Sequence, residues 1–507
     1  MGVLSIATYT SKHTDARFTI LDLNMLVLNS AEEFINKPWD VFLREKILAS
    51  LKGISPSIVG ISAIFNSNTN YLYSIAATIR ELFPETIIVA GGGVPTNMTE
   101  HVFNSAPMID GIAVGEGEKP FAGLVMAEDK KIFLAKAPGW MTKERLLVKL
   151  DPTMDLITDL DDIPFLRYDL IDFKEYQIQN RYHGERSSEN IIAPIMTSRG
   201  CPYRCSFCAS FSVHGRKMRF YSVDRILNDI RRLKEEFNVK ILVIEDDQFL
   251  FDKNRAIKIL EGIAAHNLII EFPNGLSVAD LNEELIVALK KAGLKMASLA
   301  VESGCERVLN KIIHKPYRTL DAVRNIVALM RKEQLYIRAF FIIGFPGETK
   351  EEILESIHFM KSAGFNWVAI MLASPIAGSE LYEICQKQGL LMSTAVEDFH
   401  YAKSNILLDH STPEEMENLR YHINLDVNFV NNYDLIHGQP QTALIGFLDV
   451  LGRMDDHAFA CYYAAQSYQS LGDHKQAEMF FQKYYTIIYS SKFWADQAKY
   501  FGLPLIK

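Results

Sequence analysis

Hydrophobic positions in the first 130 residues alternate between short runs at strand spacing and longer stretches at helical spacing. The pattern predicts helices at residues 1–9, 38–51, 70–82 and from Pro120, and strands at 18–22, 57–62, 86–90 and 109–114. Strands that alternate with helices indicate an α/β domain with a doubly wound, Rossmann-like parallel sheet. Ligands bind beyond the carboxyl ends of the strands in such sheets.

The same alternation returns between residues 190 and 390. It predicts strands at residues 191–197, 241–245, 269–274, 296–301, 336–343 and 367–372. The intervening helices are predicted at residues 223–237, 254–266, 281–292, 320–333 and 350–363. Six such units favour a curved, partial (β/α)6 barrel, whose chemistry gathers at the carboxyl ends of the strands.

From about residue 391 the strand pattern stops and the sequence becomes helical. Thr412 and Pro413 predict the N-cap and first turn of a helix that runs to about residue 429. Ala465, Gly472 and Phe481 fall at the spacing of one tetratricopeptide-like helix pair. Because one copy cannot bury its own faces, this part is expected to be a helical cap on the barrel or on another chain.

These patterns divide the 507 residues into parts. We predict a Rossmann-like domain at 1–130, a solvated, proline-punctuated linker at 131–189, a partial barrel at 190–390 and a helical domain at 391–507. A net charge of −9 argues against a nucleic-acid-binding face. With neither a signal-peptide pattern nor a membrane span in the sequence, we expect a cytoplasmic protein.

Three of the six cysteines, Cys201, Cys205 and Cys208, follow the first barrel strand at a spacing of four and three residues. A structural disulfide is not expected in a cytoplasmic protein, so the spacing indicates thiolates that share one inorganic centre. Since a [4Fe–4S] cluster usually takes four cysteines, three would leave one iron open to a small-molecule ligand. A zinc site with His214 as its fourth ligand is the alternative.

The CxxxCxxC spacing, with Phe207 before the last cysteine and Arg199 and Gly200 before the first, resembles the radical S-adenosylmethionine (SAM) family. The resemblance implies a [4Fe–4S] cluster on the three cysteines, with Phe207 beside the cofactors. It also implies that SAM binds the open iron through its amino and carboxylate groups and is cleaved by an electron from the cluster to a 5′-deoxyadenosyl radical.

Polar groups follow several of the predicted barrel strands. Asp246, in an acidic triplet, is predicted to meet the amino group of SAM, with an acidic helix N-terminus as the alternative. By resemblance, Glu302 and Ser303 lie near the ribose or sulfonium, and Gly344 opens the loop that shapes the adenosine pocket. Capping by Glu348 is the alternative for that loop.

Four arginines surround the cysteines, namely Arg199, Arg204, Arg216 and Arg219. Their charge would hold the SAM carboxylate or raise the cluster potential. An ordinary basic flank is the alternative, and no residue is assigned as catalytic.

Glycines at the predicted strand ends of the first domain would let a ligand approach the backbone, although a glycine triplet is also typical of a plain turn. Their combined pattern resembles the cobalamin-binding domain of many radical SAM enzymes. The resemblance implies a cobalamin site lined by Ser62, Gly91, Gly92, Gly93, Val94, Gly115, Glu116 and Gly117. The first strand of that domain is absent, because residues 1–9 already correspond to its first helix, and no Asp-x-His-x-x-Gly sequence supplies a cobalt ligand.

Residues 1–390 thus resemble a cobalamin-dependent radical SAM enzyme. The resemblance implies methyl transfer to an unactivated carbon of a small-molecule substrate or peptide, and a reducing partner such as flavodoxin or ferredoxin. Two alternatives stay open: a radical rearrangement, oxidation or cyclisation without methyl transfer, and a non-catalytic cobalamin- or cluster-responsive regulator.

Overall fold

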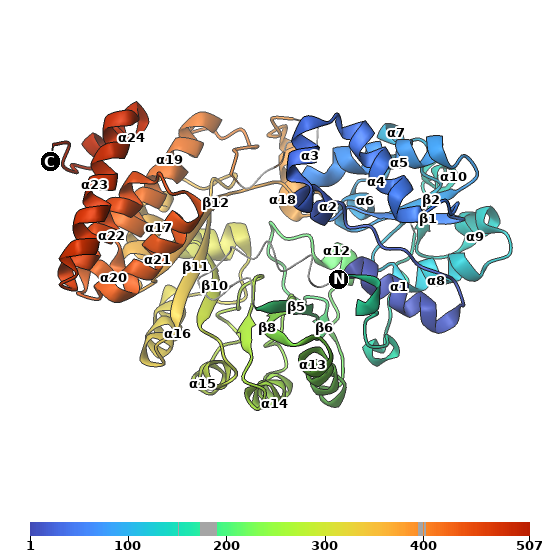
Figure 1. Ribbon diagram of the computed structural model, residues 1–507, viewed down its shortest axis with the longest axis horizontal. Helices are drawn as coiled ribbons and strands as arrows, with labels where there is room; N and C mark the ends of the chain where they lie inside the picture. The colour runs from blue at the N-terminus through green and yellow to red at the C-terminus, as the bar shows by residue number, and fades with distance from the viewer. Residues whose placement is uncertain (151, 173–189, 394–398, 400–401, 507) are drawn as a thin grey trace.

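The computed structural model describes residues 1–150, 152–172, 190–393, 399 and 402–506. Figure 1 shows the N-terminal sheet domain and the C-terminal helices at opposite ends of the molecule, with the barrel strands between them. The cysteine-bearing segment follows the first barrel strand and lies between the N-terminal sheet domain and the C-terminal helices.

The N-terminal sheet has the strand order β1-β2-β3-β4. Its strands are β1 (Ile58–Ser62), β2 (Ile87–Gly91), β3 (Gly111–Ala113) and β4 (Trp140–Met141). The first three run parallel, and β4 pairs antiparallel with β3. Ile88 and Ile112 are fully buried, as expected where helices cover both faces of a parallel sheet.

The N-terminal region contains the four helices that the periodicity of the sequence predicts and six shorter helices that it does not. They are α1 (Gly2–His13), α2 (Leu23–Asn29), α3 (Ala31–Asn36), α4 (Trp39–Leu51), α5 (Thr69–Leu82), α6 (Gly93–Asn97), α7 (Thr99–Ser105), α8 (Glu118–Met126), α9 (Lys130–Lys136) and α10 (Lys143–Leu147). The doubly wound sheet is confirmed, and residues 1–57, all of them described, contain no strand.

The predicted strand at residues 18–22 is wrong. This segment is irregular and leads into α2, whose N-cap is Asp22. Ile20 packs against the barrel core whereas Leu21 packs against the core of the N-terminal sheet. The segment therefore crosses between two cores instead of pairing with β1.

The predicted linker contains ordered structure. Helices α9 and α10 flank β4, which extends the N-terminal sheet to Met141. Leu160 and Ile163 are fully buried in the barrel core, so the interpretation of residues 159–164 as solvated is wrong. Residues 151 and 173–189 of the predicted linker lie outside the described residues.

The barrel is an arc of six parallel strands. They are β5 (Ile191–Ile195), β8 (Val239–Ile244), β9 (Ile269–Glu271), β10 (Met296–Glu302), β11 (Tyr336–Ile343) and β12 (Trp367–Leu372). The sheets β5-β8-β9 and β10-β11-β12 are joined by two parallel bridges, Ile270 to Leu294 and Leu276 to Leu299. This arrangement confirms the predicted partial barrel.

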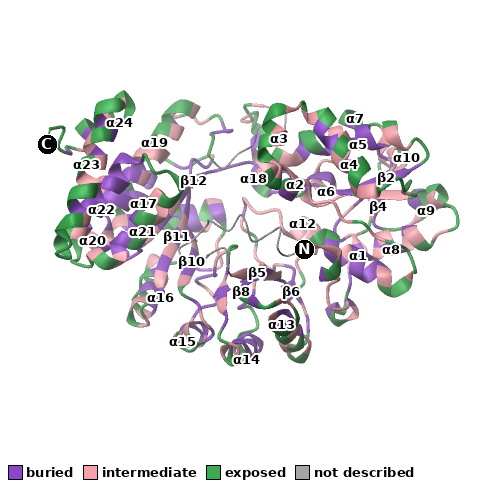
Figure 2. Cartoon of the chain, in the orientation of Figure 1, coloured by how far each residue is buried: buried purple, intermediate pink, exposed green. Residues whose placement is uncertain are grey.

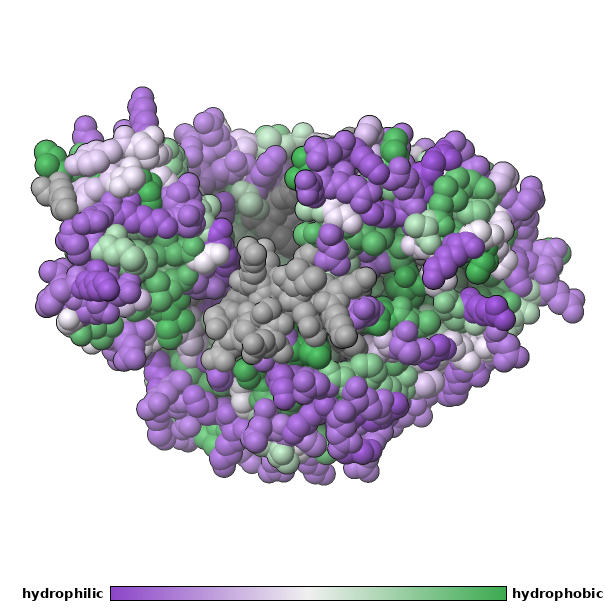
Figure 3. All heavy atoms as spheres, in the orientation of Figure 1, coloured by the Kyte–Doolittle hydropathy of each residue, from purple (hydrophilic) through white to green (hydrophobic). Residues whose placement is uncertain are grey.

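A helix follows each barrel strand. The helices are α13 (Val223–Phe237), α14 (Lys253–Ala264), α15 (Glu283–Lys291), α16 (Leu320–Lys332), α17 (Lys350–Ser362) and α18 (Glu380–Gln388), with the short α12 (Phe211–His214) in the cysteine segment. Figure 1 shows α13 to α16 along the outside of the arc, whereas α18 is drawn near the N-terminal domain. Figure 3 shows mainly hydrophilic side chains over α13 to α15. No helix in the described part of the chain is long and apolar enough to cross a membrane.

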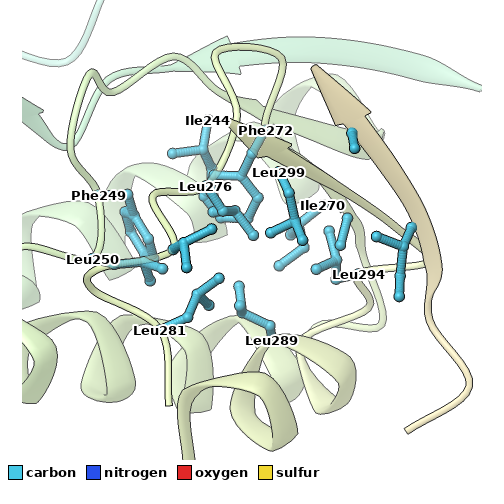
Figure 4. Close-up of a cluster of buried hydrophobic side chains, with 14 of the residues drawn as sticks. Ile244, Phe249, Leu250, Ile270, Phe272, Leu276, Leu281, Leu289, Leu294 and Leu299 are labelled. Atoms are coloured by element: carbon cyan, nitrogen blue, oxygen red, sulfur yellow. The ribbon is translucent and has the colours of Figure 1, made fainter. Parts of the chain in front are cut away.

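The barrel core lies between strands and helices. Figure 4 shows Ile270 and Leu299 from the strand layer facing Leu289 of α15, and all three are at most 1% exposed. Burying one such side chain stabilises the fold by about 1.5–3 kcal/mol. The buried colouring in Figure 2 follows the strands and the inner faces of the helices, whereas the outer helix faces are exposed.

The C-terminal region is helical, as predicted. It contains α19 (Pro413–Leu425), a π-helical turn (Asp426–Val430), α20 (Tyr433–Ile436), α21 (Pro440–Arg453), α22 (Ala458–Ser470), α23 (His474–Ser490) and α24 (Lys492–Tyr500). Thr412 and Glu415 form a capping box at the start of α19. Phe429, Phe447 and Phe459 are fully buried in a second core, separate from that of the barrel.

Candidate functional site

The three cysteines lie on one loop that leaves the barrel and returns to it. β6 (Ser198–Arg199) pairs antiparallel with β7 (Arg219–Phe220), so residues 200–218 form a loop closed at its base. Gly200 has a φ of 95°, and a Cβ there would lie 2.4 Å from the carbonyl oxygen of Lys217. Only glycine fits this close approach.

Cys201, Cys205 and Cys208 are free and partly exposed. Burial raises the pKa of the Cys201 thiol to about 12. Because iron and zinc bind thiolates, loading the site must release protons. Among the described residues, no three His, Cys, Asp or Glu side chains are gathered tightly enough to hold one metal ion. A donor set of thiols alone nevertheless fits a cluster, in which each thiolate binds a different iron.

The backbone between the cysteines is anchored to two later elements. The Ser206 amide donates to the carbonyl oxygen of Ile313 at 2.9 Å, and its own carbonyl oxygen accepts from the Leu381 amide at 2.8 Å. Ile313 ends a π-helical segment (Val308–Ile313), a rare form that often occurs at functional sites. Phe207 packs against Phe345, with ring centroids 6.4 Å apart.

Asp246 is fixed by the strand that precedes the cysteine loop. One carboxylate oxygen accepts from the Thr197 amide, and the other accepts from the hydroxyls of Thr197 and Ser198, each at 2.6 Å. Buried Arg255 donates to the carbonyl oxygen of Thr197 at 2.6 Å. Both Asp246 oxygens are therefore engaged by protein donors, which favours an anchoring role over contact with SAM.

Glu302 lies at the end of β10, where a β-bulge follows Ala300. Its φ of 75° is unusual for a residue with a side chain and costs about 1–3 kcal/mol. One of its carboxylate oxygens lies 3.3 Å from the Nζ of Lys315, and both side chains are 7% exposed. Glu302 and the neighbouring Cys205 raise the pKa of Lys315 against the effect of burial, so the lysine stays charged beside the cysteines.

The other predicted SAM residues lie on neighbouring strand ends. Ser303 is buried, and its hydroxyl is 3.1 Å from that of Ser356. Gly344, with a φ of 87°, donates through its amide to Glu348 at 2.6 Å. The second carboxylate oxygen of Glu348 is buried without a hydrogen-bond partner among the described residues. Burial raises the pKa of Glu348 to about 7.

The residues predicted to line a cobalamin site fall into two groups. Ser62 is exposed at the end of β1, and Gly91, Gly92 and Gly93 are partly exposed at the end of β2, with Val94 buried behind them. A Cβ at Gly92 would lie 2.6 Å from the carbonyl oxygen of Ala63, so the backbones pack closely here. This group fits a cradle at the carboxyl ends of parallel strands.

The second group, Gly115 to Gly117, is packed against protein. A Cβ at Gly115 would lie 3.3 Å from the carbonyl oxygen of Val213, and one at Gly117 would lie 2.6 Å from Ile6. Both carboxylate oxygens of buried Glu116 are engaged, because Arg219 donates to them at 2.9 and 2.7 Å. Burial opposes its ionisation, yet hydrogen bonds from His214 and Arg219 lower the pKa of Glu116 far below its usual range.

Sequence reasoning missed two participants in these contacts. Lys315 gave no local signal, because its partner Glu302 is 13 residues away on another element. Glu118 accepts from Arg199 at 2.7 Å and from Ser5 at 2.6 Å, across separations of 81 and 113 residues. Arg199 and Arg219, expected near the SAM carboxylate or the cluster, thus face carboxylates of the N-terminal domain.

Comparison with known families gives two matches. The profile of the radical SAM superfamily matches residues 195–360, and that of the B12 binding domain matches residues 1–125. The first match covers the cysteine loop and four of the barrel strands, β8 to β11, and the second covers β1 to β3.

Curated proteins with similar sequences include both methyltransferases and cyclases. An uncharacterised methyltransferase of Pyrococcus horikoshii is 31% identical over 73% of this chain and 78% of its own length. The cytidylyl-2-hydroxyethylphosphonate methyltransferase of Streptomyces wedmorensis is 27% identical over 69% and 72%. The anaerobic magnesium-protoporphyrin IX monomethyl ester cyclase of Cereibacter sphaeroides is 26% identical over 76% and 61%.

A solved structure shares the fold along most of the chain. The radical SAM methyltransferase TsrM from Kitasatospora setae, with cobalamin and a [4Fe–4S] cluster bound, superposes with a TM-score of 0.60 at 16% identity, covering 95% of each chain. This likeness supports the order of sheet domain, barrel and C-terminal region described above.

Proposed function

Because the chain belongs to the radical SAM superfamily and carries a B12 binding domain, we propose that it transfers a methyl group to an unactivated carbon of a small-molecule or peptide substrate. When bound, the cluster and SAM supply a 5′-deoxyadenosyl radical, and cobalamin supplies the methyl group. The observation that carries the proposal is the presence of both cofactor-binding segments in one chain, with the cysteine loop packed directly on the N-terminal domain.

The residues of the chain would hold and orient these groups. Cys201, Cys205 and Cys208 hold the cluster, with Phe207 packed behind it. The loop that begins at Gly344 would shape the adenosine pocket and is held by Glu348. The other carboxylate oxygen of Glu348 is buried, has no partner in the described part of the chain and would accept from a further donor.

A buried ion pair between Glu302 and Lys315 lies at the end of β10. Glu302 faces the ribose or sulfonium of SAM, and Lys315 keeps that carboxylate in place. The next residue, Ser303, stabilises the turn through the contact between its hydroxyl and that of Ser356. In the N-terminal domain, Ser62 and Gly91 to Gly93 would bind the nucleotide tail and corrin edge of cobalamin.

The reaction needs an electron, which the chain itself does not supply. We propose a flavodoxin or ferredoxin as the donor and the cytoplasm as the location. A cluster held by partly exposed cysteines is prone to oxidation, so a reducing compartment would protect it.

A radical cyclisation, rearrangement or oxidation without methyl transfer is the second candidate. It is favoured by the similarity to the Cereibacter sphaeroides cyclase, which covers 76% of this chain. The candidates differ in the fate of the SAM methyl group, because only methyl transfer places it in the product.

The test is anaerobic incubation of the reconstituted protein with methyl-labelled SAM, cobalamin, a reductant and cell extract. We expect label in a small metabolite or peptide, together with 5′-deoxyadenosine. Formation of 5′-deoxyadenosine with unlabelled products would instead favour the second candidate. Failure to cleave SAM under these conditions would support a cofactor-responsive regulator and refute both reactions.

A further inference from the structure

The loop that carries the cysteines depends on its base. Arg199 and Arg219 stand opposite each other in the β6–β7 pair, at the first and last positions of the hairpin that closes residues 200–218. Any change in the separation or tilt of these two residues moves the loop between them. The arrangement of the three thiols therefore depends on what holds the two arginines.

One carboxylate from the N-terminal domain contacts both ends of this hairpin. Glu116 accepts two hydrogen bonds from Arg219, and the Nη1 of Arg199 lies 3.3 Å from it. His214, inside the loop, lies 2.9 Å from the same carboxylate through its Nδ1. Glu116 thus joins the start, the interior and the end of the cysteine loop.

The side chains that make these contacts are buried. The side chains of Glu116, Arg199 and Arg219 are only 1%, 6% and 7% exposed. A buried ion pair contributes little net stability compared with apolar packing, but removal of one partner leaves an uncompensated charge. The two arginines are therefore held in one arrangement by Glu116, unlike a surface ion pair, which can adopt several. This arrangement fixes the base of the loop.

A second contact between the same two segments lies beside it. Asn97, at the end of α6, donates to the Ser212 hydroxyl in α12 at 2.9 Å. Because α6 begins at the glycines expected to hold cobalamin, the walls of the two cofactor sites touch along α6 and α12.

We propose that Glu116 is a positioning residue for the iron–sulfur site. It acts from the B12 binding domain by setting the base of the cysteine loop through Arg199, His214 and Arg219. This role goes beyond the proposed function and does not depend on methyl transfer, since it concerns how the loop presents its thiols and the open iron.

The test compares three variants of the full chain after anaerobic reconstitution. Glu116→Gln places an amide N–H against the Arg219 guanidinium, whereas Glu116→Asp keeps the charge with a shorter reach. Glu81→Gln is the matched control, because Glu81 is an exposed glutamate of the same domain that forms a surface salt bridge with Arg44. Iron content, thermal stability and the electron paramagnetic resonance spectrum of the reduced cluster are measured with and without SAM.

We expect Glu116→Gln to bind iron but to need about ten-fold more SAM for the SAM-dependent spectral change, within the usual range of coupling between sites. Glu116→Asp should recover part of that affinity, and Glu81→Gln should match wild type. A Glu116→Gln protein with the wild-type spectrum and SAM affinity overturns the proposal. If Glu116→Gln does not fold, Glu116→Asp decides: a folded Glu116→Asp protein with the full wild-type SAM affinity and spectrum would also overturn it.

Discussion

The barrel meets its two neighbouring regions through different contacts. Beside the cysteine loop, buried charges make the contact with the N-terminal domain, with Glu116 and Glu118 on Arg199 and Arg219, while Leu4 and Tyr9 add apolar packing to the barrel core. At β12, aromatic packing makes the contact with the C-terminal helices, with Trp367 against Phe429 at 5.5 Å, and Arg331 pairs with buried Asp434 nearby. The charged contact lies at the cysteine loop, and the aromatic one lies at the last strand of the arc.

The C-terminal contact covers the edge strand of the open barrel. As an edge strand, β12 would expose unpaired backbone groups. Asn428 accepts from the Val368 amide at 2.8 Å and donates to its carbonyl oxygen at 2.7 Å, in place of a further strand. A Cβ at Gly446 would lie 2.4 Å from the Trp367 ring, which shows how closely α21 approaches. We infer that this contact stabilises the barrel, whereas the charged one shapes the cofactor site.

The largest effect is expected at Asp246, which holds Thr197 and Ser198 just before the cysteine loop. Asp246→Ala removes the acceptor of three hydrogen bonds and the largest of the negative charges that act on buried Arg255. We expect a loss of about 3–5 kcal/mol in the free energy of unfolding and loss of bound iron. Denaturant unfolding and iron analysis measure both. Asp224→Ala, at an exposed position of α13, serves as control, and an equally small effect at Asp246 would contradict the anchoring role.

A smaller effect, confined to stability, is expected on the aromatic side. Asn428→Ala leaves the amide and carbonyl of Val368 unpaired, which should cost about 1–3 kcal/mol. The affinity for SAM should not change, because Asn428 contacts β12 and not the cysteine loop. Exposed Asn254 supplies the matched Asn→Ala control. Weakened SAM binding in Asn428→Ala would remove the distinction between the two contacts.

An effect that appears only as the pH falls is a pH dependence within the C-terminal core. Burial lowers the pKa of His457 to about 4, and its ring stacks on Phe429 at 4.9 Å. The unfolded chain therefore takes up a proton first as the pH falls below about 6.5, so stability is lost between about pH 6.5 and pH 4. The slope approaches about 1.4 kcal/mol per pH unit.

His457→Asn keeps an acceptor for the Ala460 amide but cannot titrate, so its melting temperature should fall less steeply over this range. Exposed His474→Asn is the control and should keep the wild-type slope. An unchanged slope in His457→Asn would assign the pH dependence to other groups.

The sequence predicts the barrel well because its signal is local. The strands at 336–343 and 367–372 are observed at their predicted bounds, since apolar runs and turn residues lie within a few positions of one another. The strand predicted at 18–22 failed because its apolar residues serve two different cores, which periodicity cannot distinguish.

The candidate site likewise has one part with a local sequence signal and one part without. The CxxxCxxC spacing is visible in eight residues, whereas the contact of Glu116 with Arg219 spans 103 positions. Glu116 was predicted beside cobalamin because its glycine neighbours suggested a ligand loop. The fold instead engages both of its oxygens with the cysteine loop, and that use of the residue needs the two domains placed together.

The most direct test of this account is SAM cleavage by the anaerobically reconstituted protein under a strong reductant. We predict iron and sulfide at the level of a [4Fe–4S] cluster, and formation of 5′-deoxyadenosine. Simultaneous replacement of Cys201, Cys205 and Cys208 by alanine should abolish both. A protein that carries zinc, or that carries iron and leaves SAM intact, would contradict the account.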